Sequence, residues 1–263
     1  MEVNMIKKKH LILVISAILS FTCLSFAQFQ GDKIYNKIKV KSGIGIEYFN
    51  RAVSLNDDEA SSSLSSYLFT LNAEFETQGG FFLNVMAGFS LSEFDSITYR
   101  ELPFSIELES GKIGGYLLGG KIKKSIITLN DFEIGGTAEF VYYIGKEKEW
   151  EISDLSVPGT VTGKPSWMRA LAGAVITYKG YDYFYPYVSI GYNKLWGTFT
   201  LEETIPNLKG TEEKKISGKS NISTVVGTVY ELTNALSINA EIKLFPYKDG
   251  VDFGLLFKAM YSF

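Results

Sequence analysis

The sequence is poor in the residues on which disulfides and imidazole-based catalysis depend. It contains one cysteine, Cys23, and one histidine, His10, and both lie within the first 27 residues. Beyond them the chain can form no disulfide and has no redox-active thiol. It also lacks the ~18 consecutive apolar residues of a membrane-spanning helix, and no long stretch has a 3.6-residue period. These absences argue against both a disulfide scaffold and a helical membrane domain.

The first 27 residues have the pattern of a secretory signal peptide. Three lysines at 7–9 precede an apolar run at 11–19, and Ser25-Phe26-Ala27 offers a small-x-small exit before Gln28. The run is shorter than the ~20 residues that a membrane anchor needs. A lipoprotein signal at Cys23 fits poorly, because Phe21 and Thr22 replace the usual small pair. We therefore expect cleavage after Ala27, leaving residues 28–263 as a single exported domain.

Cleavage would also change the charge of the protein. Residues 1–27 carry a net +2, so their loss takes the formal charge from −3 to −5. A mildly acidic chain argues against a nucleic-acid partner.

What the chain has in quantity is alternation of apolar and polar residues. In residues 81–91, for example, Phe81, Leu83 and Val85 share one face and Asn84 and Met86 share the other. A period of two with unlike faces indicates β-strands. Counting such runs predicts about ten strands, at 37–50, 64–77, 80–94, 111–129, 132–146, 166–180, 183–201, 219–233, 236–246 and 250–263. Eight or twelve strands would also fit. The fourth run slips phase near Lys121–Lys124, which indicates a bulge or its periplasmic end.

The connections alternate in length. Short ones, rich in Asn, Asp and Gly, lie at 78–79, 130–131, 180–182 and 233–235, and these residue types suit tight hairpins. Long or polar ones lie at 56–63, 95–110, 146–165 and 202–218. Short turns at one end and longer loops at the other are typical of an all-β, antiparallel, up-and-down transmembrane barrel.

The last strand adds a more specific signal. Val251, Phe253, Leu255, Phe257, Ala259, Tyr261 and Phe263 share one face, and the chain ends on the aromatic. This pattern resembles the C-terminal strand of bacterial outer-membrane β-barrels. The resemblance implies that Tyr261 and Phe263 form a signal for the barrel-assembly machinery. It also implies a Gram-negative outer membrane, with membrane lipid and lipopolysaccharide as further partners and a monomeric protein.

A secreted ligand-binding barrel would show the same alternation with its faces reversed. Glycines on the polar face favour the membrane barrel, because a narrow lumen needs small residues where long side chains must fit. They lie at 43, 45, 88, 135, 173, 191, 227 and 254. Aromatics near strand ends, such as Phe132, Tyr178, Tyr247, Tyr261 and Phe263, are those expected of interfacial girdles.

Seven charged side chains are predicted to point into the lumen: Glu47, Glu74, Glu139, Arg169, Glu241, Lys243 and Lys258. Two interpretations follow. The charges could line an ion path, or they could pair and fill the narrow interior of a small barrel. Pairing is favoured, because a charge in a narrow lumen must find a partner or water.

The expected loops offer little chemistry. The run Asn56–Glu59 has the oxygen ligands of a hard-cation site, but acidic loop runs are commonly just solvated, so no metal and no cofactor are expected. The segment 212–215 is charge-balanced and should face solvent. Trp150, Trp167 and Trp196 are expected at or above the outer rim, where they would contact lipopolysaccharide or a ligand, or equally well form part of a girdle.

Enzymes do occur among small outer-membrane barrels, including omptin-like proteases, lipid A deacylases and acyltransferases. Most of their sites use a histidine, which residues 28–263 lack. We therefore expect a non-enzymatic barrel with a structural, adhesive or narrow-pore role. A barrel hydrolase is the alternative, and a secreted ligand-binding barrel follows it.

Overall fold

The computed structural model describes residues 38–56, 61–77, 79–95, 97–99, 106–108, 110–152, 159–205 and 208–263. The expected signal peptide at 1–27 lies outside these residues. The described residues carry fourteen strands and no helix. The strands are β1 (Ile38–Leu55), β2 (Ser61–Thr77), β3 (Phe81–Phe94), β4 (Ile97–Tyr99), β5 (Ile106–Leu108), β6 (Ile113–Leu129), β7 (Phe132–Gly145), β8 (Lys148–Ile152), β9 (Gly159–Tyr178), β10 (Phe184–Ile205), β11 (Leu208–Gly218), β12 (Ile222–Glu231), β13 (Leu236–Tyr247) and β14 (Gly250–Ser262).

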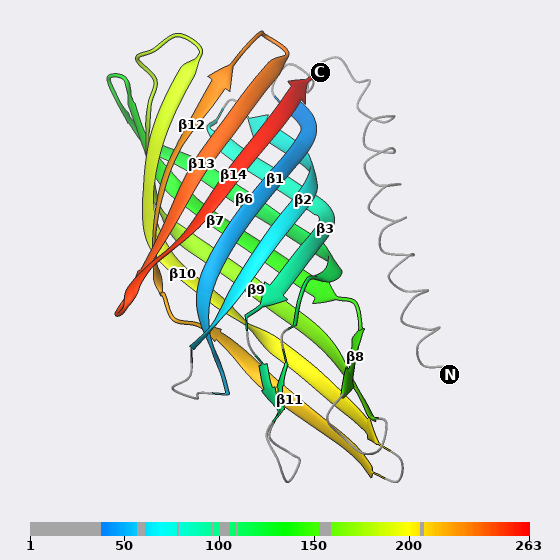
Figure 1. The fold of residues 1–263 in the computed structure, drawn as a ribbon. Helices are drawn as coiled ribbons and strands as arrows, with labels where there is room; N and C mark the ends of the chain where they lie inside the picture. Colours follow the sequence, from blue (N-terminus) through cyan, green and yellow to red (C-terminus); the bar gives the residue numbers. More distant parts are fainter. Residues whose placement is uncertain are drawn as a thin grey trace. The chain divides into compact units, whose positions relative to one another are not determined.

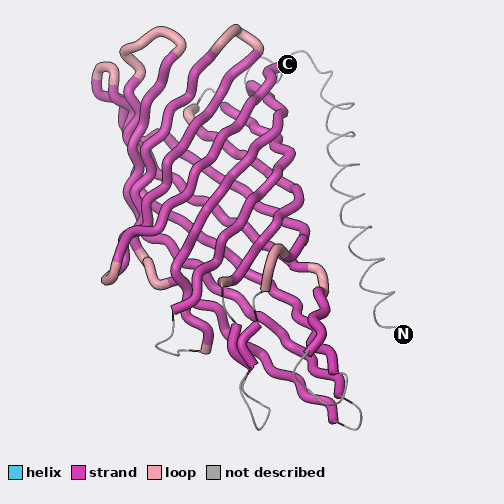
Figure 2. Tube along the Cα trace, in the orientation of Figure 1, coloured by secondary structure: helices cyan, strands magenta, loops and turns pink. Residues whose placement is uncertain are grey.

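Ten of these strands close into an antiparallel barrel (Figures 1 and 2). Neighbours follow the order β12-β13-β14-β1-β2-β3-β6-β7-β9-β10, and β10 pairs back to β12 through Phe184↔Tyr230 to Tyr192↔Ile222. The predicted fold class and strand number are confirmed. In the described part of the chain there is no helix of the length and apolar character that a membrane span requires.

The two ends of the barrel differ. The C-terminus and the turns after β2, β6, β9 and β12 lie at one, the short-turn end. The connections after β1, β3, β7 and β10 lie at the other, the long-loop end (Figure 1). Three segments expected as loops also contain strands: β4 and β5 pair as a separate hairpin, β8 extends the sheet on β9, and β11 pairs with β10. At the long-loop end, backbone pairing continues the sheet beyond the residues that the alternation of apolar and polar side chains had marked as strands.

The phase slip predicted near Lys121–Lys124 corresponds to an irregularity just beyond the lysines. The β6–β7 register shifts between Ser125 and Ile127, so that one extra residue, Ile126, is inserted into β6. An inserted residue of this kind is a β-bulge. The predicted bulge is therefore confirmed, and it lies near the short-turn end of the barrel.

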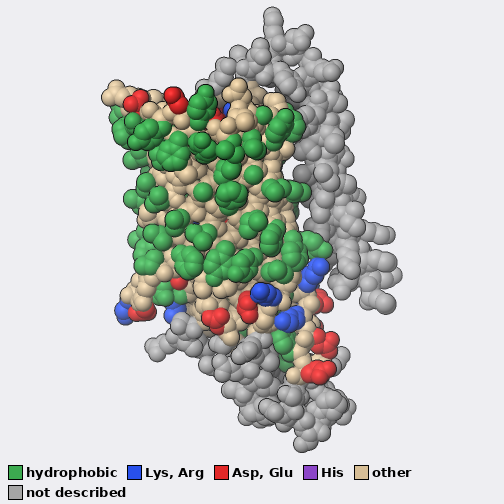
Figure 3. Space-filling model, turned by 45° about the horizontal axis from the view of Figure 1, so that its top comes forward, with side chains coloured by type: hydrophobic (Ala, Val, Ile, Leu, Met, Phe, Trp, Pro, Cys, Tyr) green, Lys and Arg blue, Asp and Glu red, His purple; other side chains and the backbone are tan. Residues whose placement is uncertain are grey.

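The outward face of the barrel is apolar and exposed. Leu71, Ile44, Ile190 and Phe257 expose half or more of their surface. In Figure 3 apolar side chains are spread over the whole visible wall, and charged side chains gather beyond the edges of this band. An exposed apolar band of this extent, free of charge, is what a barrel surrounded by lipid presents. The faces are therefore those of a membrane barrel, not of a soluble one.

Aromatic side chains border the apolar band at both ends. At the short-turn end, ring contacts link Phe132, Tyr178, Tyr181, Phe184 and Tyr230, and another joins Tyr261 to Phe263. At the long-loop end the rings of Tyr48, Tyr67 and Phe253 are in contact, as are those of Phe140 and Trp196. The first set is called the short-turn girdle below. The second, to which the exposed Tyr116 also belongs, is called the long-loop girdle. Along β10, Phe184 and Trp196 lie about 40 Å apart at ~3.4 Å per residue, or about 30 Å across the membrane at a ~40° tilt.

The barrel narrows toward the long-loop end. Pairing of β1 with β14 ends at Asn50↔Phe253, and β1 then pairs with β11 from Val53↔Gly218 to Leu55↔Ile216. At that level the β13–β14 hairpin has left the wall, so eight strands remain: β1, β2, β3, β6, β7, β9, β10 and β11. Eight strands leave an interior that side chains alone can fill.

Candidate functional site in the barrel lumen

All seven charged residues proposed for the lumen lie inside the barrel. Each is at least nine-tenths buried, with exposures from 2% at Arg169 and Lys243 to 7% at Glu139 and Lys258. They come from six strands, β1, β2, β7, β9, β13 and β14. The structure connects five of them, Glu47, Glu139, Arg169, Lys243 and Glu241, and pairs Glu74 with Lys258 separately.

The larger group is centred on Arg169. Its guanidinium donates to both carboxylate oxygens of Glu47, at 2.7 and 3.0 Å, and to Glu139 Oε1 at 2.7 Å. Lys243 Nζ lies 3.0 Å from Glu47 Oε1 and 3.3 Å from Glu139 Oε1. Two carboxylates therefore share two cations across the lumen. This is the satisfied arrangement that buried charges need, because each would otherwise pay a large desolvation cost.

Glu74 and Lys258 form a separate pair, and Glu241 joins the group around Arg169 through Lys243. Lys258 Nζ binds Glu74 Oε1 at 2.7 Å. Glu241 Oε1 accepts from Lys121 Nζ and from the Tyr187 hydroxyl, both at 2.7 Å, and Glu241 Oε2 lies 3.7 Å from Lys243. Lys121 and Tyr187 were not among the predicted lumen residues. Both occupy inward positions of their strands, and continuing the alternation of β6 as far as Lys121, which precedes the bulge at Ile126, would have found it.

Glycine provides space for this network. A Cβ atom at Gly45 would lie 2.7 Å from Thr70 Oγ1 and 3.0 Å from Lys258 Cγ. At Gly227 it would lie 2.5 Å from the Tyr187 ring, which passes over this position toward Glu241. Close approach of neighbouring side chains, rather than backbone freedom, therefore explains these inward glycines.

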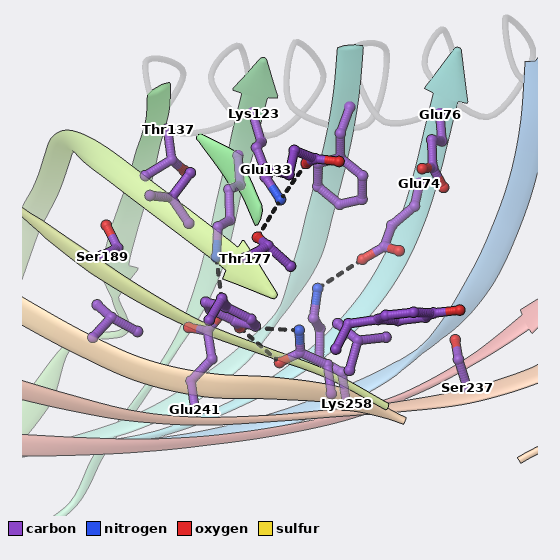
Figure 4. A pocket seen from close by; sticks show the side chains of 18 of the residues that line it. Glu74, Glu76, Lys123, Glu133, Thr137, Thr177, Ser189, Ser237, Glu241 and Lys258 are labelled. Carbon is purple, nitrogen blue, oxygen red and sulfur yellow. Dashed lines mark hydrogen bonds and ion pairs between the residues drawn. The ribbon is translucent and has the colours of Figure 1, made fainter. Parts of the chain in front are cut away.

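A cavity of about 190 Å³, lined by both charged and apolar side chains, lies in the half of the lumen near the short-turn end (Figure 4). The ion pairs Lys258–Glu74 and Lys121–Glu241 lie along its wall. Nearer the turns, Lys123 Nζ contacts Glu133 Oε1 at 3.1 Å and donates to Thr177 Oγ1 at 2.9 Å. The wall of the cavity therefore carries side chains of both charges. In each ion pair named here the two charges compensate each other.

The other half of the lumen is filled with apolar side chains. The buried cluster consists of Phe49, Val53, Leu55, Leu64, Leu68, Phe94, Ile97, Ile113, Leu117, Val141, Tyr143, Val161, Trp167, Leu195, Phe199, Leu201 and Ile216. Its members come from β4 and from all eight strands of the narrowed wall. We call this cluster the apolar plug. Paired charges alone were expected to fill the interior, but the apolar plug fills a second part of it.

Trp167 forms the centre of the plug, which corrects its expected place at or above the outer rim. It is fully buried, stacks on Tyr143 at 5.1 Å and meets Phe49 edge-on at 5.3 Å. Its indole N–H donates to Ser92 Oγ at 3.3 Å. Position 167 has the same parity as Arg169 on β9, so it faces inward. Trp196 faces the lipid side as part of the long-loop girdle, and Trp150 is partly buried and packs against the plug.

Arg51 lies at the point where β1 stops pairing with β14 and begins to pair with β11. Its guanidinium carbon lies 3.9 Å from the centre of the Phe245 ring, and its Nη2 donates to the Ser220 carbonyl at 3.3 Å. Asp252 lies 3.5 Å from Arg51 Nε and accepts from the Ala52 amide at 2.9 Å. This ion pair was not predicted, because the alternation of apolar and polar residues does not show where β1 stops pairing with β14.

Two expectations about the loops have different outcomes. Lys214 was placed in a solvent-facing segment, but it lies on the inward face of β11, is 3% exposed, and its ammonium donates to Glu212 at 2.6 Å. The extension of the sheet by β11 causes this burial. In the cation-like run, residues 57–60 lie outside the described residues. Elsewhere in the described chain, no group of three His, Cys, Asp or Glu side chains is arranged to hold a metal ion.

Comparison with known proteins supports the fold. No protein-family model and no curated protein matches the sequence. Among solved structures, the chain is similar to the outer membrane protease OmpT from Escherichia coli, with a TM-score of 0.51 and 10% identity over 87% of this chain and 97% of OmpT. It also matches the translocator domain of the autotransporter NalP from Neisseria meningitidis, with a TM-score of 0.46 and 10% identity over 93% and 98% of the two chains.

The first of these similarities concerns the fold, since the identity is too low to transfer an activity. It agrees with the closed ten-stranded wall, the exposed apolar band between two aromatic girdles and the polar, glycine-lined lumen. The chain therefore has the fold of the bacterial outer-membrane β-barrels.

Proposed function

We propose that this protein is a non-enzymatic, integral outer-membrane barrel with a closed lumen and a structural role at the cell surface. The observation that carries the proposal is the apolar plug, which occupies the narrowed part of the barrel around Trp167. Water and ions avoid a closely packed apolar interior. The ion pairs around Arg169 then fill the adjoining segment of the lumen.

The surface part of the proposal rests on the long strands. β9 has 20 residues and β10 has 22, about twice the ~9–11 needed to cross a bilayer. Their outer portions, together with β8 and β11, form a four-stranded sheet at the long-loop end. Such barrels place their longer loops outside the cell. This sheet would then be the part of the protein that other molecules meet, which suits a structural or adhesive role.

The remaining partners follow from the same proposal. The protein would be surrounded by outer-membrane lipid and lipopolysaccharide, and Phe263 and Tyr261 would be read by the assembly machinery. A monomer fits, because closure leaves no unpaired strand in the ten-stranded wall. The absence of histidine from residues 28–263 supports a non-enzymatic role. OmpT is a protease, but at this identity its activity is a property of that protein alone.

Conductance in planar bilayers tests the proposal directly. The folded protein, identified by a mobility shift on boiling in detergent, should give only small and infrequent currents. Replacing Trp167 with Ala in a Lys243→Ser and Lys258→Ser background should increase them, because plug and ion network are then both weakened. Lys243→Ser with Lys258→Ser alone is the control, and should change the currents less. Large, stable currents from the unaltered protein would replace this proposal with a porin.

A further inference from the structure

The outer part of β1 has two strands within reach. Pairing of β1 with β14 stops at Asn50↔Phe253, and β1 then pairs with β11 from Val53↔Gly218 onward. β14 itself continues through residues 250–252, which in the described structure pair with β13 alone. We call these residues the free tip, and in Figure 1 this end of the β13–β14 hairpin diverges from β1. The side of the free tip toward β1 is therefore an unpaired strand edge.

The free tip fits β1 without any change of register. Continuing the β1–β14 pairing would add three residue pairs, Arg51↔Asp252, Ala52↔Val251 and Val53↔Gly250. The present pairing with β11 also consists of three, from Val53↔Gly218 to Leu55↔Ile216. Each side chain of β1 keeps its face in both arrangements, because only the partner changes and β1 itself does not slip. β1 can therefore exchange β11 for the free tip with little loss of backbone pairing.

The observed pairing with β11 is favoured by additional hydrogen bonds. The Asn56 amide donates to the Lys215 carbonyl at 2.9 Å, and Asn56 Oδ1 accepts from the Lys215 amide at 2.7 Å. The Lys219 amide donates to the Ala52 carbonyl at 3.0 Å. These bonds make the exchanged arrangement a minor state of the protein.

Two side chains already hold the free tip beside β1. The Asp252 carboxylate accepts a hydrogen bond from the Ala52 amide at 2.9 Å, where a strand partner would offer a backbone carbonyl. The same Oδ2 atom lies 3.5 Å from Arg51 Nε. Arg51 is fully buried, yet its Nε and Nη1 find no hydrogen-bond acceptor among the described residues. Such unsatisfied donors raise the free energy of the observed arrangement, and pairing of Arg51 directly with Asp252 would bring the carboxylate closer to them.

We propose that β1 exchanges β11 for the free tip, and that this exchange is a gate at the long-loop end of the lumen. In the observed, closed arrangement Leu55 of β1 and Ile216 of β11 lie opposite each other, and both belong to the apolar plug. When β11 leaves β1, Ile216 is withdrawn from Leu55. The β13–β14 hairpin then rejoins the wall, so ten strands enclose the lumen at this level instead of eight.

The exchange would open a path through the plug, because ten strands enclose a wider interior than eight. Ions and small polar solutes could then reach the cavity near the short-turn end. The inference rests on the proposed closed lumen, and it gives the small and infrequent currents expected there a structural origin.

Two engineered disulfides test the exchange, since residues 28–263 contain no cysteine of their own. Directly opposite residues of antiparallel strands have Cα atoms about 4.5–5.5 Å apart, which a disulfide can span. The lock, Ser54→Cys with Ser217→Cys, joins β1 to β11 in the observed arrangement. The trap, Val53→Cys with Gly250→Cys, joins residues that are opposite each other only after the exchange.

A control disulfide, Ile242→Cys with Leu255→Cys, joins β13 to β14, which stay paired in both arrangements. Each variant is recorded in planar bilayers, first oxidised and then reduced, after a normal boiling shift has shown that it is folded. The control should conduct like the unaltered chain in both forms. The oxidised lock should show no openings, and reduction should restore them. The oxidised trap should carry at least about tenfold more current than its reduced form, because a minor state of at most about 10% becomes the only one.

Openings that continue undiminished in the oxidised lock would overturn the inference. It would also be overturned by a trap whose disulfide does not form, or forms without raising the current. The proposed function fails separately: large, stable currents from the unaltered chain would overturn it, whether or not the lock abolishes them.

Discussion

Removing the Arg169 side chain should destabilise the barrel more than any surface change of equal charge. Arg169 donates three hydrogen bonds of 2.7, 3.0 and 2.7 Å to Glu47 and Glu139, and all three side chains are almost completely buried. In Arg169→Ala the two carboxylates keep only Lys243, at 3.0 and 3.3 Å. One negative charge in the lumen is then uncompensated. Breaking a buried pair in this way costs about 3–5 kcal/mol.

A matched control lies on the surface. Lys164 and Glu147 form an ion pair of similar length, 2.8 Å, but their side chains are 49% and 61% exposed. Solvent screens such a pair, so Lys164→Ala should cost at most about 1 kcal/mol. A second variant, Arg169→Ala with Glu47→Gln, restores the charge balance of the lumen. This double variant should recover at least about half of the lost stability, because the main free-energy cost of Arg169→Ala is the unpaired buried charge.

The assay is reversible urea unfolding in lipid vesicles, followed by tryptophan fluorescence, because Trp167 packs in the adjoining plug. Gel mobility with and without boiling confirms that each variant folds. A loss below about 1 kcal/mol for Arg169→Ala would refute the reasoning, since an exposed pair costs as much. Failure of Glu47→Gln to rescue would show that packing, not charge balance, makes Arg169 important.

Three further outcomes are expected. Deleting Phe263 should lower the membrane-inserted fraction, measured by fractionation and boiling shift, far more than deleting a loop tip, and normal insertion would count against an assembly role. Leu255→Arg puts a charge on the lipid face and should cost about 2–4 kcal/mol in urea unfolding, whereas inward-facing Leu256→Arg should cost less; the reverse order would contradict the assignment of faces. Trp167→Ala should cost about 3–5 kcal/mol by the same measurement, and a loss below about 1 kcal/mol would show that the plug is loosely packed.

The sequence by itself determined the faces of the strands and the kind of barrel. Alternation has a period that matches the pleat, so each residue's parity assigns it to lipid or lumen. Parity alone therefore places Glu47, Arg169 and Lys243 inside the barrel, and all three are buried there. The turn residues at 78–79 and 130–131 likewise marked hairpins, because Asn and Gly tolerate the backbone angles of tight turns.

Only the tertiary structure decided which inward residues meet and where the lumen closes. Parity says that Trp167 and Arg169 face the same way, but not that one lies in an apolar plug and the other among carboxylates. The plug depends on β1 leaving β14 for β11, a pairing between Val53 and Gly218 that are far apart in the chain. Local alternation carries no information about such a change of partner. The narrowing from ten strands to eight, and with it the apolar plug, exists only once all the strands are assembled.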